Sequence, residues 1–403
     1  MTPRTRTGTA ALAVLLLTVT AGCAGADRAA QDRPAATPAR SGGSPAAQRP
    51  AAPGGASAPT PFTLVASGDV LPHDSIIRQA AADAGGSGYD FRPMFAGVKS
   101  VVSQADLAIC HMETVYGEEG GPYTGYPAFK SPPEVAVALK ETGYDSCSTA
   151  SNHTLDDGAG GLRRTLDALD KAGVKHAGSA RTAAEAARPT LLKAGHATVA
   201  QLAYTYDTNG YPLPDGQPWA VNLIDQDKIV ADARAARKAG ADVVVVSIHW
   251  GTEWQPEPDD RQLTLGRALT ASRTGGRPDI DVIIGTHAHV PQPYEKVNGT
   301  WIVYGMGDQI AGDMINYAGE HDGRGNQGSI ARFTFSPPAT QGARWQVTKA
   351  EFVPQFFDTG RGRVVNLNAA IKKGEERYTE PRDAIRRVVL DRGAAKDGLV
   401  MGE

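Results

Sequence analysis

The sequence predicts an α/β fold in which mixed β-sheet is covered by helices. Continuous apolar, β-branched runs such as FTLVAS (62–67) and ADVVVVSIHW (241–250) are typical of strands buried on both faces. Amphipathic helical patterns alternate with these runs, as they do where helices cover a sheet. Hairpin patterns, including one at Asn298-Gly299, add antiparallel pairs. A mixed sheet, or two mixed sheets sandwiched between helices, accounts for these patterns.

The folded part begins with alternating strands and helices. Three strands and three helices are predicted in the order 62–67, near Ser75, 106–112, 133–141, 144–150 and 161–174. The last helix has Leu162, Leu166 and Leu169 at helical spacing, and Gly173 stands where a helix end favours a left-handed residue.

The rest of the folded part contains mostly strands. They are predicted at 174–178, at 190–204 as a hairpin turning at Gly195, and at 241–250, 279–289, 294–306, 329–335 and 344–354, with a helix over 258–272. After Phe357 the chain turns more polar, with one weak helical pattern over 382–390. This change indicates a domain over 62–356 followed by a C-terminal extension over 357–403.

The first 23 residues have the layout of a bacterial export signal. Arg4 and Arg6 precede an apolar run over 9–21, and that run is too short to span a bilayer, which takes roughly 20 apolar residues. The run ends in AGC at Cys23, which is similar to the lipobox of bacterial lipoproteins, except that Thr20 stands where Leu is preferred. We expect Cys23 to carry lipid. The alternative is an ordinary cleaved signal in which Cys23 is incidental.

A tether and an envelope location are expected from the next segment. Residues 24–61 are almost all Ala, Pro, Gly, Ser and Gln with scattered charges. Such a composition offers too little apolar surface to offset chain entropy, so it predicts a disordered tether. A tether behind an acylated cysteine predicts an exported protein that is lipid-anchored at the outer face of the cell membrane.

Charge and cysteine content narrow the classes of function. The formal net charge is −3 and the folded part carries no run of Lys and Arg, so no basic stripe points to a nucleic-acid partner. Cys110 and Cys147 each end a predicted strand and could pair in an oxidising compartment. Two small buried thiols are the favoured interpretation.

Polar clusters follow the apolar parts of five predicted strands. They are GD at 68–69, HMET at 111–114, SNH at 151–153, SIHWG at 247–251 and GTHAH at 285–289. Ligands of α/β sheets bind beyond the carboxyl ends of strands. A single histidine at such an end is more often structural, but five ends that each offer Asp, Glu, Asn or His indicate a metal site. These donors suit Zn, Mn, Fe or Mg and include no thiolate.

Six stretches in a fixed order give the chain a recognisable family pattern. They are ASGDVLPH (66–73), ICHMET (109–114), a long stretch over 128–180, VVSIHWGTEWQPEPDDRQ (245–262), IIGTHAHVPQPYE (283–295) and WIVYGMGDQ (301–309). From 62 to 354 the chain resembles the CapA family of poly-γ-glutamate capsule-synthesis proteins, within the calcineurin-like metallophosphoesterase superfamily. The resemblance implies a four-layer sandwich, two mixed sheets flanked by helices, with a metal site at one edge.

The resemblance also implies roles for individual residues. The positions that match metal ligands are Asp69, Glu113, Asn152, His249, His287 and His289. His153 falls where the superfamily keeps a histidine that protonates the leaving group, a task suited to an imidazole. Paired divalent cations at such a site stabilise the anionic centre of a hydrolysis reaction.

The chain departs from the pattern at three places, and the first affects the metal site. Leu71 stands where the superfamily has a second histidine ligand, and His73 follows two residues later behind Pro72. We therefore expect one tight position, with Glu113, Asn152, His249 and His287, and one weaker position, with Asp69, Glu113 and His289. His111 and Asp308 each replace a usual Asn, and that affects the expected substrate details. Asp156, Trp250, Glu253 and Trp254 either line the pocket or serve local packing.

Two functions of different classes follow from these expectations. The first is a metal-dependent hydrolase, acting on a phosphoester or on an amide or isopeptide bond, in synthesis, export or remodelling of an anionic capsule polymer. Its partners would be that polymer or another envelope substrate, the membrane through the lipid anchor, and capsule-synthesis proteins. The alternative is a non-catalytic scaffold that uses an inherited metal site to hold polymer or protein partners.

Overall fold

The computed structural model describes residues 59–340 and 343–403. The predicted signal, Cys23 and nearly all of the predicted tether lie outside the described residues. Within the described ranges, no helix combines the length and the apolar character that a membrane span requires.

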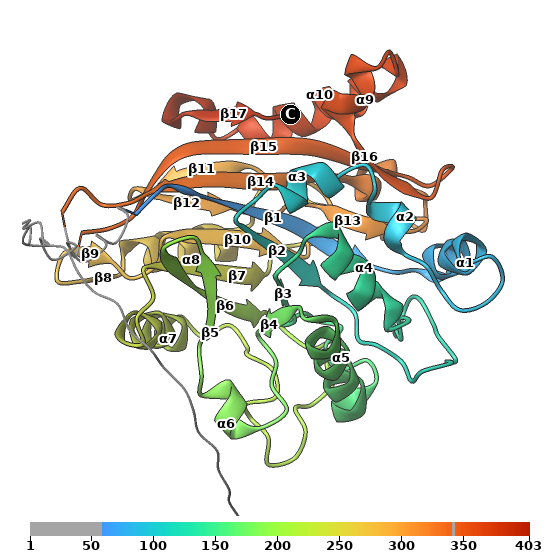
Figure 1. The fold of residues 1–403 in the computed structure, drawn as a ribbon, viewed down its shortest axis with the longest axis horizontal. Coiled ribbons are helices and arrows are strands. Elements are labelled where there is room, and N and C mark those ends of the chain that lie inside the picture. The colour runs from blue at the N-terminus through green and yellow to red at the C-terminus, as the bar shows by residue number, and fades with distance from the viewer. Residues whose placement is uncertain (1–58, 341–342) are drawn as a thin grey trace, which may run out of the picture. The chain divides into compact units, whose positions relative to one another are not determined.

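One large mixed sheet is built mainly from the first and last parts of the chain (Figure 1). Its strand order is β16-β15-β14-β1-β2-β3-β4, with β13 also paired to β1 and β17 to β15. The bounds are β1 Phe62–Leu71, β2 Leu107–Met112, β3 Ser146–Ser148, β4 Lys175–Ala177, β13 Asp308–Ala311, β14 Gln327–Ser336, β15 Gln346–Asp358, β16 Arg363–Asn366 and β17 Leu399–Met401. The central strands β1, β2, β3 and β4 are parallel to one another, so their carboxyl ends meet at one edge of the sheet.

A second mixed sheet comes from the middle of the chain, in the order β11-β12-β10-β7-β6-β5. Its strands are β5 Thr190–Ala194, β6 Ala197–Thr205, β7 Val243–His249, β10 Val282–Thr286, β11 Tyr294–Val297 and β12 Thr300–Val303. The neighbours β6, β7 and β10 are parallel, whereas β5 and β11 return as antiparallel hairpin strands. Two short strands, β8 Arg273–Thr274 and β9 Arg277–Pro278, form a separate ribbon.

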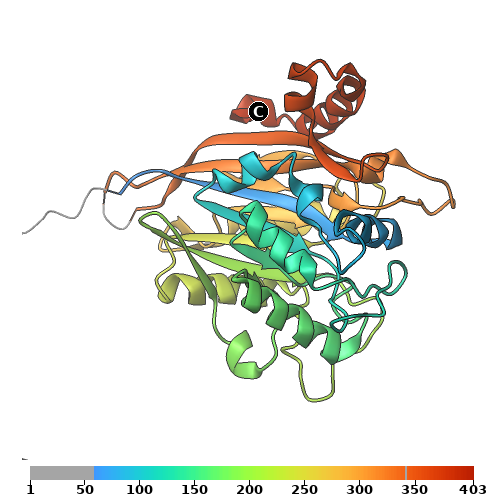
Figure 2. The same cartoon turned by 45° about the vertical axis from the view of Figure 1, so that its right-hand side comes forward.

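Helices cover the outer faces of both sheets (Figures 1 and 2). Those of the first sheet are α1 Asp74–Asp83, α2 Arg92–Phe95, α3 Lys99–Ser103, α4 Glu134–Thr142 and α5 Gly158–Ala172. The second sheet is covered by α7 Gln226–Lys238 and α8 Asp260–Ala271, while α6 Ala183–Ala186 stands between β4 and β5 in the chain. The remaining helices are α9 Leu367–Lys372, α10 Thr379–Leu390 and the short 3₁₀ turns η1 Gly323–Asn326, η2 Glu376–Tyr378 and η3 Ala394–Asp397.

The core between the sheets follows from alternation along the strands. Leu64 and Ile109 face the second sheet and share a buried cluster with Val245, whereas Val65 and Ala108 face the covering helices. Successive strand residues point to opposite faces, so the continuous apolar runs fill two cores at once. The predicted α/β class, two mixed sheets flanked by helices, is confirmed.

The predicted C-terminal extension is part of the same sheet and core. The boundary expected at 356 falls inside β15, and β16 and β17 pair with that strand. Ile385 and Val389 of α10 share a buried cluster with Phe333 and Phe352. The elements after 357 are short, so their apolar residues give a weak periodic signal although they bury well against β14 and β15.

Helix α7 has no counterpart among the predicted elements. Its buried residues are Ile229, Ala233 and Ala236, so two of the three positions on its inner face are alanines. A small-residue face packs closely on a sheet but gives only a faint apolar pattern in the sequence.

Cys110 and Cys147 form a disulfide, so the favoured expectation of two free thiols is wrong. The two residues are register partners in the parallel pair β2–β3, with Cα atoms 4.4 Å apart. Sequence alone could not decide the pairing, because it depends on the strand register that brings these two positions side by side.

Candidate metal centre

Five parallel strands from two sheets deliver polar side chains to one region. Asp69 lies on β1 next to His111 of β2 in register, and Asp308 of β13 is its partner on the other side. In the second sheet, His249 ends β7 and is the register partner of Thr286, which ends β10. The His111 and His249 rings stack with centroids 4.7 Å apart, so the two strand-end groups meet across the sandwich.

Glycine is required where β1 meets the loop before β13. A Cβ added to Gly68 would lie 1.6 Å from the carbonyl oxygen of Gly307, a severe clash. Gly307 itself has φ of 67° and leaves only 2.3 Å between an added Cβ and the Gln327 carbonyl oxygen. This close approach lets the Asp69 N–H donate to the Gly307 carbonyl at 3.1 Å and sets Asp308 beside Asp69.

The loop after β10 holds two histidines in left-handed backbone conformations. His287 has φ of 96° and His289 has φ of 56°, values that residues other than glycine adopt at a cost. The His287 N–H donates to Asp69 Oδ2 at 3.1 Å, which ties the loop to β1. Strained backbone that persists next to a polar cluster is a common feature of functional sites.

Three carboxylates are fully buried in the centre without full hydrogen bonding. Asp69, Glu113 and Asp308 are at most 1% exposed. The oxygens that find no partner among the described residues are Asp69 Oδ1, both Glu113 Oε atoms and Asp308 Oδ2. Native proteins rarely leave buried carboxylate oxygens unpaired, because desolvating such a group is costly. A cation is the kind of partner that these oxygens lack.

The imidazoles offer nitrogens to the same space. His249 Nε2 lies 2.9 Å from Asn152 Oδ1 and 3.7 Å from Glu113 Oε1, while its Nδ1 bonds Thr286 Oγ1 at 3.0 Å. His111 Nε2 lies 3.5 Å from Asp69 Oδ1, and that nitrogen has no hydrogen-bond partner among the described residues. His287 Nδ1 also has no hydrogen-bond partner among the described residues.

Asn152 and His153 follow β3 and differ in their contacts. The Asn152 side chain turns its oxygen to His249 and donates from Nδ2 to Asn209 Oδ1 at 3.2 Å. His153 Nδ1 bonds Asp156 Oδ2 at 2.6 Å, and its ring meets Phe129 edge-on at 4.8 Å between centroids. Asp156 therefore orients the His153 ring, as carboxylates orient functional histidines.

Burial shifts the pKa values of the ionisable groups in the cluster toward their neutral forms. Burial is the main cause that raises the pKa values of the three carboxyls, and the neighbouring Asp308 and Asp69 charges add to it for Asp69 and Glu113 respectively. Burial lowers the pKa values of three imidazoles, those of His111, His249 and His287. Burial also acts against the charged form of His289, but Asp308 and Glu113 raise its pKa. A bound cation favours carboxylate and neutral imidazole, the forms that ligate metals.

Three overlapping groups bring ligand atoms within 4.8 Å of one another. They are Asp69 with His111 and His249, Glu113 with His287 and His289, and Asp69 with His289 and Asp308. Asn152 joins through its bond to His249. The structure thus brings together all six side chains expected as ligands, and their chemistry fits a divalent ion.

His111 and Asp308 were not expected as ligands, although both belong to these groups. His73 does not belong to them. Its Nδ1 lies 3.0 Å from the Leu71 carbonyl and 3.2 Å from the Gly312 N–H, which are backbone contacts. A sequence signal for both additional residues did exist. Each is a titratable residue in or just after a predicted strand, with His111 in β2 and Asp308 at the start of β13.

Aromatic and acidic side chains surround the centre. Tyr206 lies over His287 with ring centroids 4.4 Å apart, and Trp254 lies 6.4 Å from His289. Glu253 accepts a hydrogen bond from Tyr317 at 2.7 Å. Trp250 is instead a packing residue, since it is 3% exposed and donates to the Tyr304 carbonyl.

Solved structures with a similar arrangement are distant. A calcineurin-like phosphoesterase from Bacillus subtilis matches 80% of this chain and 99% of its own, at 14% identity and a TM-score of 0.43. A phosphatase from Mycoplasma pneumoniae matches 73% of this chain at 15% identity and a TM-score of 0.44. Likenesses of this degree do not bear on activity.

Sequence relatives are closer. The PGA biosynthesis protein CapA of Bacillus subtilis is 31% identical over 178 residues, which cover 44% of this chain and 45% of the relative. A probable polyglutamine synthesis accessory protein of Mycobacterium tuberculosis is 26% identical over 246 residues, or 58% of this chain and 63% of the relative. The chain therefore spans about half the length of these relatives. The family described as bacterial capsule synthesis protein PGA_cap matches residues 63–313, and the chain belongs to that family.

Proposed function

We propose that this protein is a metal-dependent hydrolase of the cell envelope that acts in synthesis, export or remodelling of a poly-γ-glutamate type capsule polymer. The observation that carries the proposal is the set of buried carboxylate oxygens and imidazole nitrogens at the strand ends that have no partner among the described residues. The polymer comes from the names of the family and its relatives, which concern capsule and poly-γ-glutamate synthesis.

The metal ligands would serve two positions. Glu113, Asn152, His249 and His287 would hold the tighter ion, and Asp69, Glu113 and His289 would hold the weaker one. Asp308 lies in one group with Asp69 and His289, so it would supply a donor that Leu71 does not. His111 would add a nitrogen beside Asp69 and His249. Bound divalent ions, Mn, Zn, Fe or Mg, would stabilise negative charge that develops on the attacked group.

His153 would protonate the leaving group. Its Nδ1 bonds the buried Asp156 carboxylate, which favours the tautomer with hydrogen on Nδ1 and fixes the orientation of the ring. The other ring nitrogen is then the one that can carry and release a proton. The burial of the ring against Phe129 holds its orientation without using it as a metal ligand.

An envelope location would follow from lipid on Cys23. For a Cys23→Ala variant we expect loss of the processed, membrane-bound form, because the acyl chains on this cysteine would be the anchor. Fractionation of cells into membrane and medium checks this, and the variant should be released or left unprocessed. Processed variant that stays with the membranes would contradict the anchor.

A turnover assay separates the hydrolase from the scaffold. Purified protein with added Mn²⁺ or Zn²⁺ would be tested on a chromogenic phosphoester and on poly-γ-glutamate, with chelator-treated protein as the control. Metal-dependent turnover of either substrate supports the hydrolase and identifies the bond. If neither the phosphoester nor poly-γ-glutamate is turned over by protein that still binds the polymer, the non-catalytic scaffold would be favoured.

A further inference from the structure

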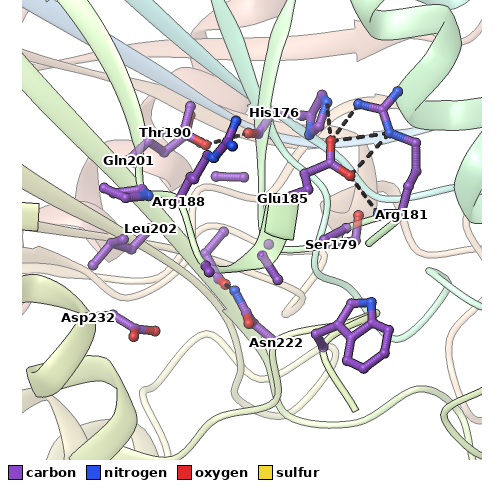
Figure 3. A pocket seen from close by; sticks show the side chains of 18 of the residues that line it. His176, Ser179, Arg181, Glu185, Arg188, Thr190, Gln201, Leu202, Asn222 and Asp232 are labelled. Atoms are coloured by element: carbon purple, nitrogen blue, oxygen red, sulfur yellow. Dashed lines mark hydrogen bonds and ion pairs between the residues drawn. The ribbon is translucent and has the colours of Figure 1, made fainter. Parts of the chain in front are cut away.

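A cavity of about 720 Å³ lies away from the metal-centre side chains, none of which lines it. It opens beside the edge of the second sheet, with walls from β4, β6, α6 and the segment leading into β5 (Figure 3). Among the described residues β5 pairs with β6 only as far as Gln201, so the edge from Leu202 to Tyr204 faces this space, where Asn222 Nδ2 donates to the Ala203 carbonyl at 3.2 Å.

The acidic side chains in the wall are already paired. Glu185 accepts from Arg181 at 2.5 Å (Figure 3). Arg181 also donates to Asp170 at 2.7 Å and to Asp167 at 2.6 Å. Asp232 accepts from the Tyr204 hydroxyl at 2.7 Å and pairs with Lys228. The negative charge of the lining is therefore compensated within the protein.

Three cations of the wall have no such compensation. Arg163, Lys175 and Arg188 are exposed, and none makes a salt bridge or side-chain hydrogen bond to the described part of the chain. They come from α5, from β4 and from the segment between α6 and β5. The cavity thus presents positive charge from several sides.

Two buried donor groups in the same wall also lack partners. Gln201 is fully buried, and although its Oε1 accepts from Ser146 at 2.5 Å, its Nε2 donates to no described residue. The indole N–H of Trp219 is buried and likewise without an acceptor among the described residues. Both unmet groups are hydrogen-bond donors, so a matching ligand must supply acceptors.

We propose that this cavity binds a carboxylate-rich chain through Arg163, Lys175 and Arg188, with Gln201 and Trp219 donating to its oxygens. Cations on three separate elements suit several anionic groups spaced along a chain better than one compact anion. The identification of that chain as the capsule polymer rests on the proposed function. The cavity would hold the polymer while another part of it reaches the metal centre.

Binding of labelled poly-γ-glutamate to the full protein tests this assignment. The variant carries Arg163→Gln, Lys175→Gln and Arg188→Gln, and its matched control carries Arg78→Gln, Lys373→Gln and Arg386→Gln, three exposed cations outside the cavity. Both lose the same charge. We expect the cavity variant to bind about tenfold more weakly or worse, and the control to bind nearly as the wild type does.

One further variant and three competitors test which groups account for the measured polymer binding. Trp219→Phe keeps an aromatic ring and removes the donor, so it should weaken binding by a few-fold. Neutral dextran should not compete, and free glutamate should compete better than inorganic phosphate. Equal binding by the cavity variant and its control, no binding by the wild type, or preferred competition by phosphate would each overturn the assignment.

The metal centre is tested separately. A His249→Ala variant should lose turnover under the proposed function and yet bind the polymer as the wild type does. A wild-type protein that binds the polymer but turns over neither test substrate with added metal would refute the hydrolase and leave the cavity assignment standing.

Discussion

Replacing His153 by alanine should lower turnover by about 10²–10⁴-fold while the metal content stays nearly unchanged. The ring bonds Asp156 and packs against Phe129, and it belongs to none of the three groups of candidate ligands. Its loss would therefore remove a proton donor and leave the ligands in place. Steady-state kinetics together with elemental analysis of the purified variant measures both quantities.

An Asp156→Asn variant serves as the companion to this test. Asparagine keeps the size of the side chain but replaces the carboxylate that bonds His153 Nδ1 at 2.6 Å, so the ring is held less firmly and a smaller fall in turnover is expected. Metal depletion of His153→Ala to the level of a His249→Ala variant would mean that His153 is a ligand, which would reverse the roles proposed for the two residues.

Replacing Asp308 by asparagine should weaken the second metal position and spare the first. Titration of metal-free wild-type protein is expected to show two separated steps, because the first position has the fuller set of ligands. In Asp308→Asn the second step should move to a metal concentration about 10–100-fold higher, the range found when a supporting carboxylate is lost. Calorimetry or competition with a metal indicator gives both steps without any need for turnover.

His73→Ala is the control for this experiment. His73 contacts the backbone at Leu71 and Gly312 and lies in no ligand group, so its removal should leave both steps where they are. A shift of the second step in His73→Ala, with Asp308→Asn unchanged, would show that His73, and not Asp308, replaces the ligand that Leu71 cannot provide. Two equally tight positions in every variant would contradict the two-position proposal.

Much of the site was predictable because it lies at strand ends. The carboxyl ends of parallel strands meet at one edge of a sheet, so side chains that follow apolar runs in the sequence come together there. These side chains are Asp69, Glu113, Asn152, His249, His287 and His289. Their metal roles stay predictions, but their proximity is a property of the fold. The hydrophobic pattern of the sequence predicted the type and order of the helices and strands and the residues at their ends.

The α/β class and the set of polar strand ends could be predicted from the chain, because buried strands and helices leave their periods in it, and the family resemblance added the second sheet. Other features depend on contacts that form only in the folded protein. The Cys110–Cys147 bond depends on the β2–β3 register, and the inclusion of Asp308 depends on the close approach of Gly68 and Gly307. The basic cavity depends on which cations find partners. Each is a relation between residues far apart in the chain, and such relations are fixed by packing rather than by local pattern.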